Sequence, residues 1–174
     1  MEDKILRLIM EAFEDKNISY IPADDGRVIA QFNGDEVETV CMYRATESGV
    51  MFRAFYDLGN KVTKENRGNV LEYVNKMNSG FLEGALCVDE DGSIVYSVFL
   101  EFSGVEKRDF LEHKILHVLR VALETEQMFS NMLKQILRGN ETAMPAVVDS
   151  IVNQNASQTK EADDIEFMSY FKKE

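Results

Sequence analysis

The feature that most constrains the fold is a predicted helix that stops sharply and runs into a predicted β-hairpin, at residues 63–102. Thr63 is a potential N-cap for the helix, and Asn78-Ser79-Gly80 would end it. The apolar positions of this predicted helix are Val70, Leu71, Val74 and Met77. A helix with one apolar side next to a hairpin indicates an α+β unit whose helix packs against the sheet.

The hairpin is predicted from two strand-like stretches, residues 81–88 and 93–102. The residues between them, Asp89-Glu90-Asp91-Gly92, favour a turn because Asp bonds to nearby backbone amides and Gly accepts positive φ. The same four residues lack the twelve-residue spacing and the terminal glutamate of a calcium loop. We therefore interpret them as a turn and not as a metal site.

The N-terminal half adds a helix and three strands. Strands are expected at residues 27–32, 36–44 and 50–56, and Asn33-Gly34 predicts a two-residue type I′ turn between the first two strands. The helix before them is indicated by apolar residues at the spacing i, i+3, i+4, i+7 and i+8, namely Ile5, Leu8, Ile9, Ala12 and Phe13.

A long helix is predicted over residues 105–137, which contain neither Pro nor Gly. It has two apolar stripes, so we expect its middle to be buried on two sides. One side would face the sheet, and the other would face the C-terminal segment or a second copy of the chain. The first stripe comprises Leu111, Ile115, Val118, Ala122, Phe129, Met132 and Ile136, and the second comprises Leu116, Leu119 and Leu123.

The order of elements divides the chain into a main domain at residues 1–138 and an extension at residues 139–174. The extension is expected to contain a short helix at 141–155, followed by a mobile polar tail. The last residues of the tail are apolar again, which leaves two alternatives: docking on the body or a partner, or a frayed terminus.

Charge and composition exclude several partners. Thirty-one acidic and nineteen basic residues give a net charge of −12, which repels phosphate backbones and anionic lipids. Neither nucleic acid nor a membrane is therefore an expected partner. Cys41 and Cys87 are isolated thiols, which are typical of a reducing compartment, and the N-terminus lacks the pattern of a signal peptide. We expect a cytoplasmic protein.

Catalytic chemistry is not indicated. His113 and His117 lie four residues apart with Asp109 one turn earlier, but no further ligands complement them, so we interpret them as a polar strip on the exposed side of the helix. No phosphate loop or nucleophile elbow is present. The expectation is a protein that is not an enzyme, with no cofactor, no metal and no catalytic residue.

The order of elements resembles the fold of the type III secretion chaperones and, more closely, the YbjN-like family of small bacterial proteins that share it. The resemblance depends on residues 71–78 running into Gly80-Phe81-Leu82, on the Asp91-Gly92 turn and on Val95-Tyr96, and it covers roughly residues 2–125. It implies a shared α-βββ-α-ββ-α order and a non-enzymatic sensory or regulatory module. The related chaperones dimerise and hold segments of client proteins. The motif positions are structural, so no functional residue is carried over.

The sequence thus predicts an α+β domain with a twisted, mostly antiparallel sheet packed by helices. The expected function is that of a protein-binding, chaperone-like or regulatory module, acting as a homodimer on a protein or peptide client. Met51, Phe55 and Phe99 are the candidate partner contacts, because they are Met or aromatic residues in strands. The alternatives are a small-ligand sensor with a closed pocket, an unrecognised enzyme, and a structural subunit of an assembly.

Overall fold

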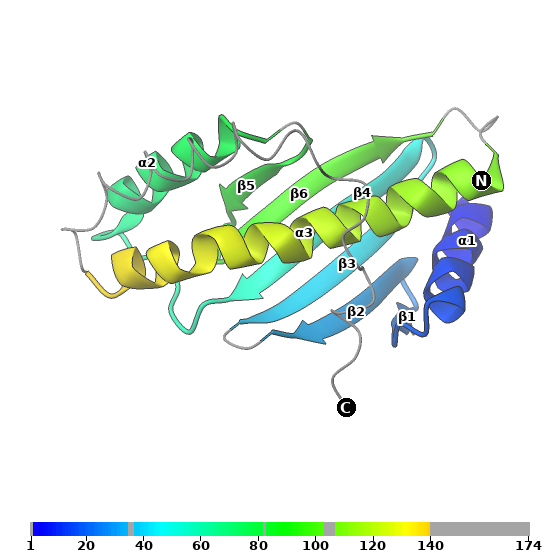
Figure 1. Cartoon of the computed structure of the whole chain (residues 1–174), viewed down its shortest axis with the longest axis horizontal. Helices are drawn as coiled ribbons and strands as arrows, with labels where there is room; N and C mark the ends of the chain where they lie inside the picture. Colours follow the sequence, from blue (N-terminus) through cyan, green and yellow to red (C-terminus); the bar gives the residue numbers. More distant parts are fainter. Residues whose placement is uncertain (1, 35–36, 82, 103–106, 140–174) are drawn as a thin grey trace.

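The computed structural model describes residues 2–34, 37–81, 83–102 and 107–139 (Figure 1). These residues form three helices and one antiparallel sheet with the strand order β1-β2-β3-β4-β6-β5, which confirms the α+β class. The elements along the chain are α1 (Glu2–Asp15), β1 (Ile21–Ala23), β2 (Arg27–Asn33), β3 (Glu38–Thr46), β4 (Gly49–Asp57), α2 (Arg67–Asn78), β5 (Ala85–Val88), β6 (Ile94–Glu101) and α3 (Arg108–Leu137).

The predicted element order is correct except for one additional strand. β1 has three residues and pairs only with β2, through the register Ile21↔Ile29 to Ala23↔Arg27. It was missed because three residues are too few to show alternation. Pro22 is tolerated there because an edge strand leaves one row of backbone groups unpaired.

The predicted turn at Asn33-Gly34 is wrong. Asn33 belongs to β2 and pairs with Glu38 of β3, and the N–H of Gly34 donates to the carbonyl of Val37 at 3.0 Å. Asn33 and Gly34 therefore precede the turn and are not its two central residues. The next hairpin, between β3 and β4, closes at Thr46↔Gly49.

The helix α2 begins later than predicted. Its N-cap is Asn66, and the Asn66 side-chain oxygen accepts a hydrogen bond from the Thr63 N–H at 2.8 Å, so Thr63 is not the cap. The C-terminal end is where the sequence places it, because Asn78 is the last residue and Ser79 is the C-cap. The buried side also includes Tyr73, which the apolar pattern did not select.

The β5–β6 hairpin is antiparallel as predicted, but its first strand is half as long. The N–H of Gly92 donates to the carbonyl of Asp89 at 3.0 Å, and Gly92 has a φ of 82°, so the acidic residues form a turn. The strand predicted over residues 81–88 begins only at Ala85.

One face of the sheet carries all three helices, which gives the domain two layers (Figure 1). α1 packs on β2 and β3, and α3 lies across β4 and β6. The five apolar residues predicted for the first helix are all buried. Two tyrosines fasten α3 to the sheet: the Tyr43 hydroxyl donates to the Ile115 carbonyl at 3.0 Å, and the Tyr56 hydroxyl donates to the Ala122 carbonyl at 2.9 Å.

Most residues of the two predicted stripes of α3 are buried within the single chain. Leu119 is fully buried and Leu123 is 8% exposed, whereas Leu116, the third residue of the second stripe, is only half-buried. Leu119 and Leu123 therefore give no support to a dimer, and the homodimer stays a prediction. In the part of the chain that is described, none of the helices has the length and apolarity to cross a membrane. The predicted helix at 141–155 and the tail lie outside the described residues, and the division at residue 138 stays a prediction.

Candidate functional site

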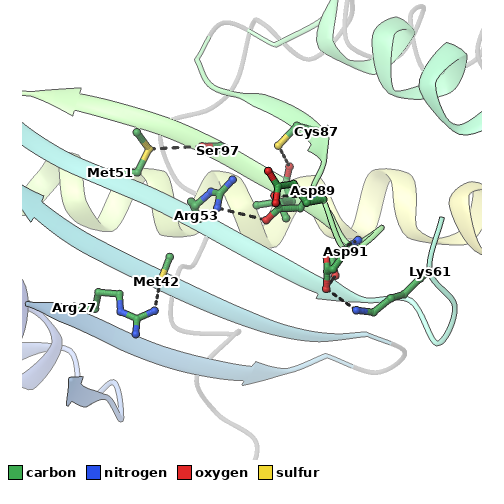
Figure 2. A network of polar contacts seen from close by, with 12 residues as sticks. Arg27, Met42, Met51, Arg53, Lys61, Cys87, Asp89, Asp91 and Ser97 are labelled. Atoms are coloured by element: carbon green, nitrogen blue, oxygen red, sulfur yellow. Dashed lines mark hydrogen bonds and ion pairs between the residues drawn. The ribbon is translucent and has the colours of Figure 1, made fainter. Parts of the chain in front are cut away.

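None of the described helices covers the face of the sheet opposite α3. Strand register places alternate side chains on this face, which we call the open face, and Figure 2 looks onto it with α3 behind the strands. A β-sheet normally buries its apolar face, so apolar side chains on an uncovered face indicate a surface for contacts. The main open-face residues are Arg27, Ile29, Val40, Met42, Arg44, Met51, Arg53, Phe55, Ser97 and Phe99.

All three predicted contact residues lie on the open face. Met51 pairs directly with Phe99 across β4 and β6, and Phe55 pairs with Val40 on β3 and Val95 on β6. Phe99 is 43% exposed, whereas Met51 and Phe55 are half-buried. The structure therefore brings these residues together on one surface. That they contact a partner stays a prediction.

The methionines of the open face are held by polar neighbours (Figure 2). The Arg27 guanidinium donates to the Met42 sulfur at 3.4 Å, and the Ser97 hydroxyl donates to the Met51 sulfur at 3.7 Å. Thioether sulfur is a weak acceptor, so these contacts orient the side chains without fixing them tightly. The surface keeps the adaptability that suits a protein-binding site.

Three arginines on the open face are functional candidates that sequence reasoning missed. The Arg53 guanidinium lies 5.6 Å from the centre of the Phe55 ring and 3.5 Å from the Asp89 carboxylate. Arg27 pairs with Asp25 at 2.7 Å, which lowers the pKa of that carboxyl, and Arg44 is exposed. A cluster of guanidiniums is unusual in a chain of net charge −12. The strand alternation could have indicated this cluster once the hairpin registers were known.

A groove of about 750 Å³ lies on the other side of β6, between that strand and the first half of α3. Its α3 wall carries Phe110, His113, Lys114 and His117. The two imidazoles stack with their centres 6.2 Å apart, and His117 Nε2 lies 3.8 Å from the Glu83 carboxylate. His113 is exposed, as expected, whereas His117 is only 35% exposed at its side chain.

The groove does not form a metal site from the side chains described. Within residues 2–34, 37–81, 83–102 and 107–139 no three His, Cys, Asp or Glu side chains gather at metal-binding distance. Burial, followed by the positive charge of Arg120, lowers the pKa of His117 below its usual range. The imidazole is therefore neutral at pH 7.

Cys41 is a buried thiol, and Cys87 is a half-buried one. Burial raises the pKa of Cys41 well above its usual range and also raises the pKa of Cys87, whose sulfur donates to the Val95 carbonyl at 3.3 Å. Both are free cysteines that remain protonated at neutral pH, and a protonated thiol is a poor nucleophile.

A smaller hollow of about 370 Å³ lies at the start of β3 and the end of β4. The open-face residues Val40 and Phe55 line it. Like the groove beside β6, it opens to solvent and is not the closed pocket that a small-ligand sensor would need.

The fold and its surfaces define a class: a two-layer α+β domain with all described helices on one face of an antiparallel sheet and an apolar, arginine-bearing opposite face. Solved structures show that this fold is YbjN-like. The crystal structure of YbjN from E. coli, described as a candidate transcription regulator, matches with a TM-score of 0.50 and 12% sequence identity, over 86% of this chain and 93% of that chain. No protein-family model matches the sequence, and no curated protein matches it.

Proposed function

We propose that this chain is a non-enzymatic protein-binding module with a regulatory or chaperone-like role. The observation that carries the proposal is the open face, where Met51, Phe55 and Phe99 share a surface with three arginines. Adaptable Met side chains, aromatic rings and guanidiniums are the groups enriched in protein interfaces. The description of YbjN as a candidate transcription regulator supports a regulatory role. The net charge of −12 favours protein contacts over nucleic-acid contacts.

The client is expected to be an acidic amphipathic segment. Arg44 is exposed, and Arg53 lies beside the ring of Phe55, so carboxylates of a client would meet positive charge next to an apolar surface. Neither the position of the guanidiniums nor the apolar neighbours requires an enzyme activity. The non-enzymatic nature of the module is part of the proposal.

The test is a selection of peptides from a random library displayed on phage, using the full chain as the target. Peptides that bind through the open face should lose at least about tenfold in affinity on the double variant Arg44→Glu, Met51→Gln, as expected when an interface loses an ion pair and an apolar contact. Met128→Gln is the matched control, because Met128 is also an exposed methionine, 39% exposed, but lies on α3. Equal loss in both variants, or no loss in either, would contradict the proposal.

A homodimer is the second part of the proposal. It is measured by light scattering on the full chain and on a version that ends at Asn140. A mass of twice the 19.9 kDa of one chain in both samples supports a dimer through the main domain. A full chain that stays at 19.9 kDa over a range of concentrations would refute it.

A further inference from the structure

The strand β6 has eight residues and is twice as long as its neighbour β5, which has four. Residues Ala85–Val88 of β5 pair with Ile94–Ser97, whereas β4 pairs with β6 as far as Glu101. Among the residues that the structure describes, no strand pairs with the β5 side of residues 98–101. We call this stretch the free edge.

The backbone groups at the free edge follow from the alternation of the ladder. The Phe102 N–H donates to the Ser48 carbonyl on the β4 side, and the Ser93 carbonyl accepts from the Asp89 N–H on the β5 side. Successive residues of a strand point their backbone groups to opposite sides. The N–H and C=O groups of Phe99 and Glu101 therefore point to the free edge.

The free edge exists because Gly84 turns the chain away from β6. Gly84 has a φ of 69°, and a Cβ at this position would lie 2.6 Å from the Tyr96 ring. The Tyr96 hydroxyl also donates to the Glu83 carbonyl at 2.9 Å, which holds the turn in place. Residues before Ala85 therefore cannot continue along β6.

At the outer edge of β5, in contrast, a side chain pairs with the backbone groups of Leu86. The Asn78 carboxamide accepts from the Leu86 N–H at 2.7 Å and donates to the Leu86 carbonyl at 2.9 Å, so it pairs like a short strand. Exposed edges promote aggregation and are usually covered. The Asn78 side chain covers the edge of β5 at Leu86, whereas none of the described strands pairs with the adjacent edge of β6.

The free edge borders the groove under α3. Val98 and Leu100 line the groove from β6, and Phe110 and Lys114 line it from α3. Phe110 is 49% exposed, and the Lys114 ammonium lies 4.9 Å from the centre of its ring. An unpaired strand beside a helix-walled groove is the arrangement used for binding a peptide by strand addition.

Charge indicates which segment fits. Glu101 is exposed, and no ion pair of the described residues involves it. A residue directly opposite Glu101 on an added strand would lie within cross-strand contact distance. With a net charge of −12 on the chain, a basic residue at this position is favoured.

We propose that the free edge of β6 binds an extended segment of a partner protein as an added antiparallel strand. Alternate residues of the segment are apolar and enter the groove under α3, and a Lys or Arg lies opposite Glu101. This site uses main-chain groups of Phe99 and Glu101 at the edge of the sheet. Among the open-face side chains its charge preference involves only Glu101, so it goes beyond the open-face function.

The test uses a decapeptide library displayed on phage and the full chain. The expected peptides alternate apolar residues with a Lys or Arg. Saturation with such a peptide should slow hydrogen exchange of the Phe99 and Glu101 amides, followed by NMR, by at least about tenfold, as hydrogen bonding of an exposed amide does. If no peptide is enriched, or if protection appears elsewhere, the proposal is wrong.

Three variants at one position separate edge pairing from charge. Glu101→Pro removes an N–H that faces the free edge and should abolish binding, whereas Glu101→Ala keeps the edge and should lose only the preference for a basic residue. Glu101→Lys should select peptides with an acidic residue instead. This charge exchange keeps the test decisive if the proline variant does not fold. Peptides that bind all three variants equally would overturn the proposal.

Other occupants give different outcomes. Protection of the Phe99 and Glu101 amides without peptide that increases with protein concentration would mean that a second copy occupies the edge. Protection that is independent of concentration would mean that the chain covers its own edge. Both outcomes refute the proposal. Peptides lost on Arg44→Glu, Met51→Gln but retained on Glu101→Pro would refute the strand addition and leave the open-face function standing.

Discussion

Replacing a buried tyrosine by Phe is expected to change the stability of this protein in opposite directions at different positions. The hydroxyls of Tyr43 and Tyr56 donate to carbonyls of α3 at 3.0 and 2.9 Å. The hydroxyl of Tyr73 is also buried, but it has no hydrogen-bond partner among the residues described. Burial raises the pKa of Tyr73 to about 12, so this hydroxyl is neutral at pH 7. Replacing each tyrosine by Phe removes one oxygen and leaves the ring in place.

The size of each change in the free energy of unfolding depends on whether the tyrosine hydroxyl forms a hydrogen bond. A satisfied buried hydrogen bond contributes about 1 kcal/mol net, so Tyr43→Phe and Tyr56→Phe should each lower the free energy of unfolding by about 1 kcal/mol. A buried hydroxyl without a partner costs about 1–3 kcal/mol of desolvation. Tyr73→Phe should therefore raise the free energy of unfolding by about 1 kcal/mol or more.

Urea denaturation followed by far-UV circular dichroism measures all three variants. With a denaturant slope of about 2 kcal/mol/M, the midpoint should shift by about 0.5 M downward for Tyr43→Phe and Tyr56→Phe and upward for Tyr73→Phe. The slope itself should not change. A Tyr73→Phe variant that loses as much stability as Tyr56→Phe would refute the reasoning, because its hydroxyl would then be satisfied.

Three further predictions concern the elements around the free edge. Gly84→Ala should cost about 3 kcal/mol, because it combines a positive φ with a collision against the Tyr96 ring, whereas Gly59→Ala, with nothing within 4 Å, should cost about 1 kcal/mol in the same urea assay. Asn78→Ala should cost about 2 kcal/mol and speed hydrogen exchange in β5, because two hydrogen bonds to that strand are lost. Burial is the main cause that lowers the pKa of His117 in the folded chain below 6.5. As the pH drops below 6.5, the unfolded chain therefore binds this proton before the folded chain does, and the free energy of unfolding falls. His117→Gln should remove this part of the loss when urea midpoints at pH 7.5 and pH 5.5 are compared, and an unchanged loss would contradict the assignment.

The sequence was sufficient where periodicity was long and uninterrupted. The five apolar residues of α1 are buried as predicted, and so are all stripe residues of α3 except Leu111 and Leu116, because burial of a helical face requires that spacing. The turn ending in Gly92 was also predictable, because Asp and Gly favour turns through local interactions.

Errors arose where tertiary contacts override local preference. Residues 81–84 have the composition of a strand, but Gly84 packs against the Tyr96 ring, and the ladder ends there. The Asn33-Gly34 pair favours a tight turn, but pairing of Asn33 with Glu38 extends β2 as far as Asn33. Strand pairing energies depend on residues distant in sequence, which local propensity cannot report.

The candidate site was only partly visible from the sequence. Met51, Phe55 and Phe99 were selected by residue type, and the register places them on one face. Arg44 and Arg53 belong to the same surface, which emerges only when β3 and β4 are aligned.

The sequence by itself determined the class of the fold and the identity of most core positions, since both follow from periods of two and 3.6 residues along the chain. Only the tertiary structure decided which sheet face the helices cover and where β6 extends beyond β5, so that no described strand pairs with the outer side of Phe99 and Glu101. These properties depend on the length difference between β5 and β6 and on the side of the sheet that α3 takes. Such choices are made by packing between distant segments, and no local pattern encodes them.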